Sequence, residues 1–234
     1  MISTKYRSNS KEIMDDFDMT GDVLIKTLDQ IAKINVLLGG NSLTLNGVKQ
    51  LLKNQPKDQP ITIVDLGCGN GDLLRIIAKY GRKKGYTFQL LGIDANKFTL
   101  EYAMQLSKKY PEITYLEQDV LSEEFKEQSY DIALSTLFLH HFTNEEIENI
   151  LEVLQNQAKI GVVINDLHRH KLAYYLFKII TLFIKNKMVK NDGLISILKG
   201  FKKQELKNFA KQLKGKSSIV WRWAFRYQWI IKYN

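Results

Sequence analysis

Residues 63–74 read IVDLGCGNGDLL, and this stretch decides how the chain folds. It begins with apolar residues of the kind buried in a parallel sheet, and it ends at the start of an amphipathic helix. Gly67, Gly69 and Gly71 lie in between. Glycine permits a tight turn and lets a ligand approach the backbone closely. The stretch therefore predicts a strand, a ligand-binding turn and a helix.

The spacing and charge of this turn differ from those of a dinucleotide-binding loop. A G-x-G-x-x-G motif starting at Gly67 needs glycine at position 72, where the chain has Asp72. A pyrophosphate would also meet the carboxylates of Asp65 and Asp72, and like charges within ~4–6 Å repel by an energy on the order of kcal/mol. An ammonium group on the ligand reverses that sign. S-adenosylmethionine (SAM) carries an ammonium and a sulfonium, so the turn favours SAM.

Strand and helix patterns alternate on both sides of the turn. Strands are expected at residues 61–67, 87–95, 113–120, 130–138 and 160–167, and helices at 72–85, 97–110 and 143–157. Thr143 and Glu146 have the spacing of a capping box. Alternation of this kind implies right-handed βαβ crossovers. The chain is therefore predicted to be an α/β protein with a doubly wound, Rossmann-like sheet.

The two ends of the chain follow different patterns. Residues 21–40 and 42–54 show helical spacing, with Gly39 and Gly40 as a stop between them. After residue 168 the alternation ends: residues 170–186 and 202–213 read as helices. Residues 218–233 are rich in β-branched and aromatic side chains and predict a closing hairpin, although its turn has neither Gly nor Pro.

Composition narrows the class of protein. A chain of 234 residues with 44% hydrophobic residues has enough material for a proper core. The single cysteine, Cys68, excludes an internal disulfide framework and fits a reducing cytoplasm. The N-terminus lacks the apolar segment of a signal peptide. The longest apolar run, residues 172–184, contains Lys178 and is too short to span a membrane, so a cytoplasmic protein is expected.

Charge is distributed unevenly. Residues 168–234 contain 16 Lys and Arg and two acids, a net +14, whereas residues 1–167 carry a net −5. A basic C-terminal third of the chain, joined to an acidic remainder, predicts that one side of the protein binds an anionic partner or a membrane surface. The alternative is a solvated lysine-rich surface with no partner.

Further acids follow the next two strands. Asp94 ends the second strand, where it can accept hydrogen bonds from ribose hydroxyls, and Asp119 follows the third, where it can bind an adenine amino group beside Val120. Each acid could instead cap the next helix. Together with Asp65 and Asp72, these two residues make four acids at the strand ends. Open α/β sheets bind ligands at this edge, so a binding role is favoured over capping.

The motifs VDLGCGNGD, GIDAN, QDV and YDIALSTLFLHHF, spread over residues 61–167, resemble the successive motifs of class I SAM-dependent methyltransferases. LHHF, INVLLGG and VVINDLHRHKLAYYLFK are most similar to bacterial small-molecule methyltransferases, including those acting on quinones, phenols and polyketides. The resemblance implies seven strands with an antiparallel last strand, a helical N-terminal lid at residues 1–55, and a methyltransferase domain at 56–234 with an acceptor-site insertion at about 168–200. The cofactor-binding residues expected are Asp65, Gly67, Cys68, Gly69, Gly71, Asp72, Asp94, Ala95, Asn96, Asp119, Val120 and, by resemblance, Ser135.

The four histidines follow the fourth and fifth strands, where the methyl acceptor would lie. His140 is the first choice for a general base, and His168 or Asp166 the second, with His141 beside them. Each histidine could instead pack against the lid or cap a helix. No ligand spacing is diagnostic of a metal, so none is assigned. Aromatic residues of the insertion, Tyr174, Tyr175 and Phe177, are candidates for an apolar acceptor wall.

Three functions remain open from the sequence. The leading hypothesis is methyl transfer from SAM, to oxygen, on an apolar or aromatic small molecule that is anionic or carrier-bound, with peripheral membrane contact through the basic third. The second is an RNA methyltransferase that uses the same basic third, although the chain has no recognised RNA-binding module and nucleic acid is disfavoured. The third is a SAM-binding protein without catalysis.

Overall fold

A computed structural model describes residues 2–233. The strands are β1 (Ile61–Leu66), β2 (Phe88–Asp94), β3 (Ile113–Glu117), β4 (Tyr130–Thr136), β5 (Ala158–Leu167), β6 (Lys216–Arg222) and β7 (Arg226–Lys232). The α-helices are α1 (Asp22–Leu37), α2 (Gly40–Leu51), α3 (Asp72–Lys84), α4 (Lys97–Leu106), α5 (Asn144–Gln157), α6 (Lys171–Ile180), α7 (Lys187–Lys199) and α8 (Lys203–Ala210). Short 3-10 turns are η1 (Ile13–Asp15), η2 (Leu52–Asn54), η3 (Glu124–Glu127) and η4 (Leu139–His141).

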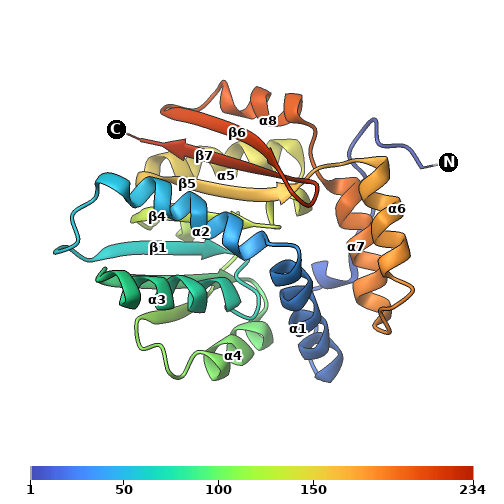
Figure 1. The fold of residues 1–234 in the computed structure, drawn as a ribbon, viewed down its shortest axis with the longest axis horizontal. Coiled ribbons are helices and arrows are strands. Elements are labelled where there is room, and N and C mark those ends of the chain that lie inside the picture. The colour runs from blue at the N-terminus through green and yellow to red at the C-terminus, as the bar shows by residue number, and fades with distance from the viewer. Residues whose placement is uncertain (1, 234) are drawn as a thin grey trace.

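The seven strands form one sheet in the order β3-β2-β1-β4-β5-β7-β6 (Figure 1). β1 pairs in parallel with β2 and β4, and β4 pairs in parallel with β5. β7 inserts antiparallel between β5 and β6. The predicted doubly wound sheet with an antiparallel last strand is therefore confirmed, and the hairpin turn falls at residues 223–225.

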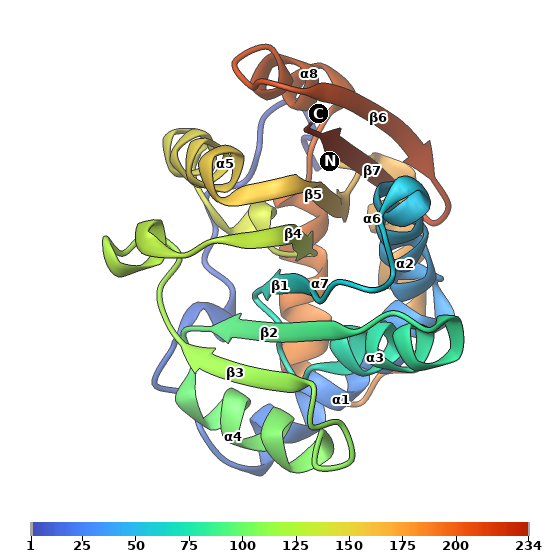
Figure 2. The same ribbon diagram turned by 90° about the vertical axis from the view of Figure 1, so that its left-hand side faces the viewer.

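Helices cover both faces of the sheet (Figure 2). On one face, α2 and α3 bury Val48, Leu74 and Ile77 against β1 and β2. On the other face, α5 and α8 bury Leu151 and Phe209. β1 is apolar on both sides because both of its faces are covered, as expected for a central parallel strand.

A third group of helices lies beyond the C-terminal ends of the parallel strands. Figure 1 shows α1, α6 and α7 at the end toward which the β1 and β5 arrows point. The N-terminal segment also crosses this end, where Ile13 and Met14 donate backbone hydrogen bonds to Asp192 in α7. α2 differs from a lid helix because it packs on the sheet: a Cβ at Gly47 would lie 2.5 Å from Val163.

Two helix predictions need correction. Residues 170–186 do not form one helix, because α6 ends at Ile180 and a turn follows, in which the Thr181 hydroxyl donates to the Lys178 carbonyl. The helix α7 was missed, since its sequence holds Asp192 and Gly193 and shows little apolar periodicity. Tertiary contact explains the glycine: a Cβ at Gly193 would lie 2.4 Å from the Phe177 ring. The Thr143–Glu146 capping box is confirmed.

Candidate cofactor and acceptor site

A cavity of about 1530 Å³ lies at the C-terminal ends of the parallel strands. The glycine turn and the loops after β2, β3 and β4 form its floor, and α1, α6, α7 and the N-terminal segment enclose it. Most of the residues that the sequence singles out for ligand binding line this cavity. This is the edge at which open α/β sheets bind ligands.

The glycine turn needs its glycines for backbone geometry. Gly67, Gly69 and Gly71 all have positive φ, between 52° and 73°. A Cβ at Gly67 would lie 2.2 Å from the Phe138 ring, and one at Gly71 would lie 2.1 Å from the Tyr115 hydroxyl. Gly67 and Gly69 line the cavity, whereas Gly71 lies behind it and shapes the turn.

Three carboxylates gather beside the turn. Asp65 is buried at 3% exposure, and burial raises its pKa well above the usual value, with Asp72 and Asp94 adding negative charge. Asp72 accepts a hydrogen bond of 2.5 Å from Asn41. Within residues 2–233, no Lys, Arg or His forms an ion pair with Asp65, Asp72 or Asp94. Ionised carboxylates are rarely left buried without a cationic partner, so this wall fits a ligand with a positively charged group.

The acids after β2 and β3 also line the cavity. Asp94 accepts hydrogen bonds from the backbone amides of Gly69 and Asn96, at 3.1 and 3.0 Å, and burial raises its pKa in spite of them. Those bonds fix the carboxylate at the edge of the cavity. Asp119 accepts from the Leu121 amide at 2.9 Å, and Val120 is buried beside it. Cys68, Ala95 and Asn96 line the cavity as well, whereas Ser135 is fully buried in β4 and Thr136 takes its place.

His140 is held by Asp166. The His140 Nδ1 lies 2.8 Å from Asp166 Oδ1, and the His140 amide donates to Asp166 Oδ2 at 3.2 Å. Burial alone would raise the pKa of Asp166, but His140 lowers it below its usual value. The ionised carboxylate accepts and cannot donate, so Nδ1 carries the proton. His140 lines the cavity, and its Nε2 has no hydrogen-bond partner among residues 2–233.

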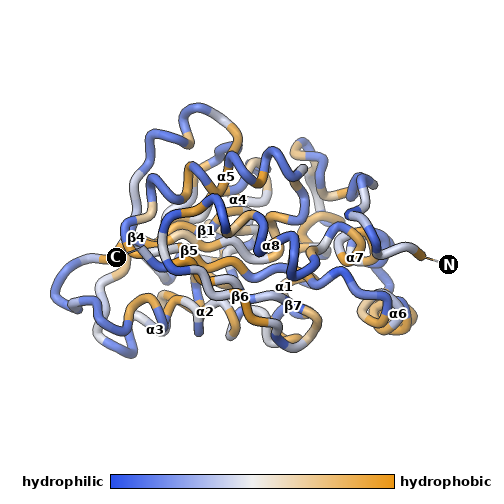
Figure 3. Tube along the Cα trace, turned by 90° about the horizontal axis from the view of Figure 1, so that it is seen from above, coloured by the Kyte–Doolittle hydropathy of each residue, from blue (hydrophilic) through white to orange (hydrophobic). Residues whose placement is uncertain are grey.

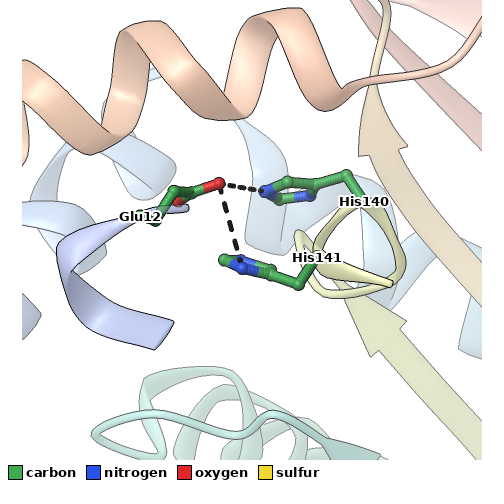
Figure 4. A group of neighbouring side chains, drawn as sticks. All are labelled: Glu12, His140 and His141. Carbon is green, nitrogen blue, oxygen red and sulfur yellow. Dashed lines mark ion pairs between the residues drawn. The ribbon is translucent and has the colours of Figure 1, made fainter. Parts of the chain in front are cut away.

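The N-terminal segment brings Glu12 to this histidine (Figure 4). Glu12 Oε1 lies 3.9 Å from His140 Nε2 and 3.8 Å from His141 Nδ1. Burial raises the pKa of Glu12. These three ligand atoms lie within 4.8 Å of one another, a spacing that a divalent cation could bridge. However, Lys199 Nζ lies 3.4 Å from the same Glu12 oxygen and already supplies positive charge there.

His168 lies apart from His140. The Trp221 indole donates to His168 Nδ1 at 3.2 Å, and the His168 ring packs on Tyr227 with centroids 4.9 Å apart. Burial, helped by Lys202, lowers the pKa of His168 to about 4. His168 lines the cavity, but it is a neutral ring held in an aromatic cluster.

Apolar side chains line the part of the cavity beyond the carboxylates. α1 contributes Leu24, Leu28 and Ile31, and α6 contributes Phe177 and other residues of the predicted insertion. The prediction of an aromatic acceptor wall is partly corrected: Phe177 lines the cavity, whereas Tyr174 and Tyr175 do not.

Sequence reasoning missed the contribution of the N-terminal segment. Glu12 and Asp15 precede α1 in a polar stretch with no motif, and Lys199 ends a helix that was not predicted. Their meeting depends on contacts over more than 120 residues, such as the 2.7 Å hydrogen bond between Asp15 and His141. No local pattern signals such a contact.

Comparison with known proteins agrees with this geometry. Residues 63–161 match a family described as a methyltransferase domain. The chain is 34% identical over 113 residues to 2-phytyl-1,4-naphtoquinone methyltransferase of Nostoc sp., covering 46% of this chain and 47% of that protein. The enzyme of the same name from Thermosynechococcus vestitus is 38% identical over 72 residues, 31% of each chain. The chain thus spans about half or less of the curated relatives it matches.

Solved structures share the fold over most of the chain. The plantazolicin methyltransferase BpumL in complex with S-adenosylhomocysteine (SAH) has a TM-score of 0.66 at 17% identity, covering 91% of this chain and 89% of that one. Magnesium protoporphyrin IX methyltransferase from Synechocystis, also with SAH, has a TM-score of 0.57 at 15% identity, covering 92% and 90%. These structures confirm the predicted fold, a doubly wound α/β sheet with an antiparallel last strand, and the family match covers residues 63–161 of the 234-residue chain.

Among residues 2–233, no helix combines the length and apolar character needed to cross a membrane.

Proposed function

We propose that this protein is a SAM-dependent methyltransferase that transfers the methyl group to an oxygen of an apolar or aromatic small molecule. One observation carries the proposal: buried Asp65, together with Asp72 and Asp94, forms a carboxylate wall beside a glycine turn, and none of the three makes an ion pair within residues 2–233. The curated relatives named for naphthoquinone methylation support a small apolar acceptor.

The residues at the turn fit the cofactor part by part. The carboxylates of Asp65 and Asp72 suit an ammonium group, and the Asp94 carboxylate suits ribose hydroxyls. Asp119 and Val120 would hold the adenine edge and ring. When bound, SAM supplies a methyl group on a sulfonium, an already activated electrophile. The protein's task is then to orient the acceptor and to remove its proton.

His140 is the base that the geometry favours. Asp166 holds the ring through Nδ1, and the other ring nitrogen, Nε2, has no hydrogen-bond partner within residues 2–233. The same division of roles, with a carboxylate orienting and a histidine accepting a proton, serves hydrolases. Asp166 is therefore a positioning residue, and the acceptor hydroxyl would lie against His140. His141 and His168 are secondary candidates.

Apolar residues of α6 support an acceptor that arrives from a lipid surface. Leu172, Tyr175, Leu176 and Ile179 share one face of α6 and are 42–56% exposed. Leu182 and Phe183, just after the helix, are 76% and 85% exposed. Figure 3 shows α6 as an apolar segment at the outer edge of the molecule. Exposed lysines flank this face at positions 171, 178, 185 and 187. An apolar face rimmed by lysines is typical of helices that bind anionic membranes.

Isothermal titration with SAH tests the cofactor. The wild-type protein is expected to bind SAH, and Asp94→Ala is expected to abolish or strongly weaken that binding. No heat of binding for the wild type, or equal affinity for the Asp94→Ala variant, would contradict the proposal.

Transfer of label from methyl-labelled SAM tests the acceptor. We expect labelled product with 1-naphthol and 1-hydroxy-2-naphthoate, and acid-stable ether linkage in the product identifies oxygen as the acceptor atom. A salt-sensitive gel shift with RNA, together with labelled RNA and no labelled naphthol, would favour the RNA alternative.

Co-sedimentation with vesicles tests the α6 face. Binding is expected with phosphatidylglycerol mixed into phosphatidylcholine and not with phosphatidylcholine alone. Replacing Lys178 and Lys185 by Gln should weaken binding by about fivefold per lysine. The same change at two exposed control positions, Lys207 on α8 and Lys211 just after it, should weaken binding less. Binding to an acidic carrier protein and not to vesicles would assign the face to a carrier-bound acceptor.

A further inference from the structure

Two arginines are buried in the C-terminal third, and their surroundings differ. Arg169 is fully buried, and its guanidinium donates to both Glu205 oxygens and to three backbone carbonyls. Arg226 is 2% exposed, yet its Nε and Nη1 have no hydrogen-bond partner among residues 2–233. Buried charged groups ordinarily have such partners, so the bare guanidinium of Arg226 requires an explanation.

Arg226 borders the cavity in the neighbourhood of Asp166, the carboxylate that holds His140. It is the first residue of β7, pairs with Leu167 in β5, and lines the cavity. Asp166 lies near enough to act on its pKa, but the Asp166 oxygens already accept hydrogen bonds from His140 and from the Leu167 amide. Burial lowers the pKa of Arg226 to about 10, so the side chain stays charged at neutral pH.

The start of α2 adds a second positive end beside this guanidinium. Gly40 is the first residue of α2, and a Cβ at that position would lie 2.9 Å from Arg226 Nη1. The N-terminus of a helix carries a partial positive charge and free backbone amides. The same Cβ would lie 1.9 Å from Asn35 Oδ1, so glycine leaves room for both side chains beside a helix end that attracts anions.

We infer that Arg226 is the recognition residue for a carboxylate, or an equivalent planar oxyanion, on a ligand that fills the cavity. The guanidinium offers paired N–H donors that match the two oxygens of a carboxylate. Such a group can come from the methyl acceptor or from the methionine part of the cofactor. The proximity to Asp166, which holds His140, favours the acceptor. This inference rests on the proposed function and adds to it a preference for acceptors that carry an acid group.

Thermal unfolding without ligand tests whether Arg226 is held for a ligand or for the fold. Arg226→Met removes a buried charge whose Nε and Nη1 have no hydrogen-bond partner within residues 2–233, so we expect a higher melting temperature than in the wild type. Arg169→Met removes a fully bonded guanidinium and isolates Glu205, so we expect a lower one. A melting temperature that falls as far for Arg226→Met as for Arg169→Met would assign Arg226 a structural role and overturn the inference.

Titrations with two matched ligand pairs identify the source of the carboxylate. 1-Hydroxy-2-naphthoate and 1-naphthol differ by a carboxylate, and SAH and S-adenosyl-3-thiopropylamine differ by the carboxylate of the amino-acid part. We expect Arg226→Gln to weaken hydroxynaphthoate binding by about 10- to 100-fold and to leave naphthol unchanged, because one partner of a charge-assisted pair is lost. Arg226→Lys should recover part of the loss.

Each outcome of these titrations either supports or overturns the assignment of Arg226 to a ligand carboxylate. A loss confined to hydroxynaphthoate supports the inference and assigns the group to the acceptor. A loss confined to SAH, with its decarboxylated analogue unchanged, supports it and assigns the group to the cofactor. An equal change for both members of each pair, or none, overturns it. Failure of the wild type to bind SAH would remove the proposed function but would leave the hydroxynaphthoate comparison intact.

Discussion

The charge of Asp65 can be tested by a nearly isosteric change, Asp65→Asn. The side chain is 3% exposed at the end of β1, and asparagine fills the same volume without the negative charge. Two quantities should respond in opposite directions: the affinity for SAH should fall, and the stability of the ligand-free protein should rise.

The loss of affinity follows from the expected contact with an ammonium group. A hydrogen bond to a charged group contributes about 1.5–3 kcal/mol, which corresponds to a Kd about 10- to 150-fold weaker for the variant. Asp72 and Asp94 remain in the variant, so binding should weaken but persist at high SAH concentrations.

The gain in stability follows from the direction of the pKa shift. Because the pKa of Asp65 is raised in the folded protein, the wild type loses stability as pH increases from the carboxyl pKa of the unfolded chain, about 4, toward the folded value. The asparagine variant has no carboxyl group at this position, so it does not lose stability over this pH range. Its melting temperature without ligand should therefore exceed that of the wild type at pH 7, and the difference should shrink below pH 4.

Isothermal titration with SAH and thermal unfolding at several pH values measure both effects. Asp131→Asn is the matched control: this carboxylate accepts a 2.8 Å hydrogen bond from the Thr62 amide at the opposite end of the sheet. That change should lower stability and leave SAH affinity unaltered. If Asp65→Asn bound SAH as tightly as the wild type, or if it melted at a lower temperature at pH 7, the assignment of this wall to a cationic ligand would be wrong.

Four further substitutions, with Gly85→Ala as a control, test the site and the turn. His140→Gln should lower kcat by about 100-fold or more while SAH affinity stays unchanged, and Asp166→Asn should act in the same direction, measured by transfer of labelled methyl to 1-naphthol. A large rise in Kd for SAH would instead give His140 a cofactor-binding role. His168→Gln should remove a loss of stability that the wild type shows as pH falls from 6.5 toward 4, because burial lowers the pKa of this ring, as thermal unfolding across that range will show. Identical pH profiles would refute this. Gly71→Ala should cost about 2–4 kcal/mol in urea unfolding, since the added Cβ would meet the Tyr115 hydroxyl, whereas Gly85→Ala, with the same φ and open space, should cost about 1–2 kcal/mol. Equal costs would mean that the contact with Tyr115 is unimportant.

Much of the sheet could be predicted from local pattern. Buried parallel strands are apolar along their whole length, and the helices between them are amphipathic, so both leave clear periodicities in the sequence. α7 left no such signal, because it is enclosed by the N-terminal segment, α6 and α1 and has no single apolar face. The end of α6 was predicted too late, because the apolar residues continue past Ile180 into a turn. These residues are exposed there, so their apolar character does not indicate a buried helix face.

The candidate cofactor residues could be named in advance because they follow the strand ends in sequence. Asp65, Asp94 and Asp119 each follow or end a strand, and parallel strands bring such positions to one edge of the sheet. Ser135 does not line the cavity, whereas the next residue, Thr136, does, because side chains alternate between the two faces of a strand.

The sequence alone determined the sheet, its ligand-binding edge and the negative charge of the turn, because each depends on residues within a few positions of one another. Tertiary structure decided which groups meet across that edge. It brought Glu12 to His140 and bound His140 to Asp166, and it left Nε and Nη1 of Arg226 buried without a hydrogen-bond partner among the described residues. Such contacts join residues more than 20 positions apart, and in the case of Glu12 more than 120, so no local spacing encodes them.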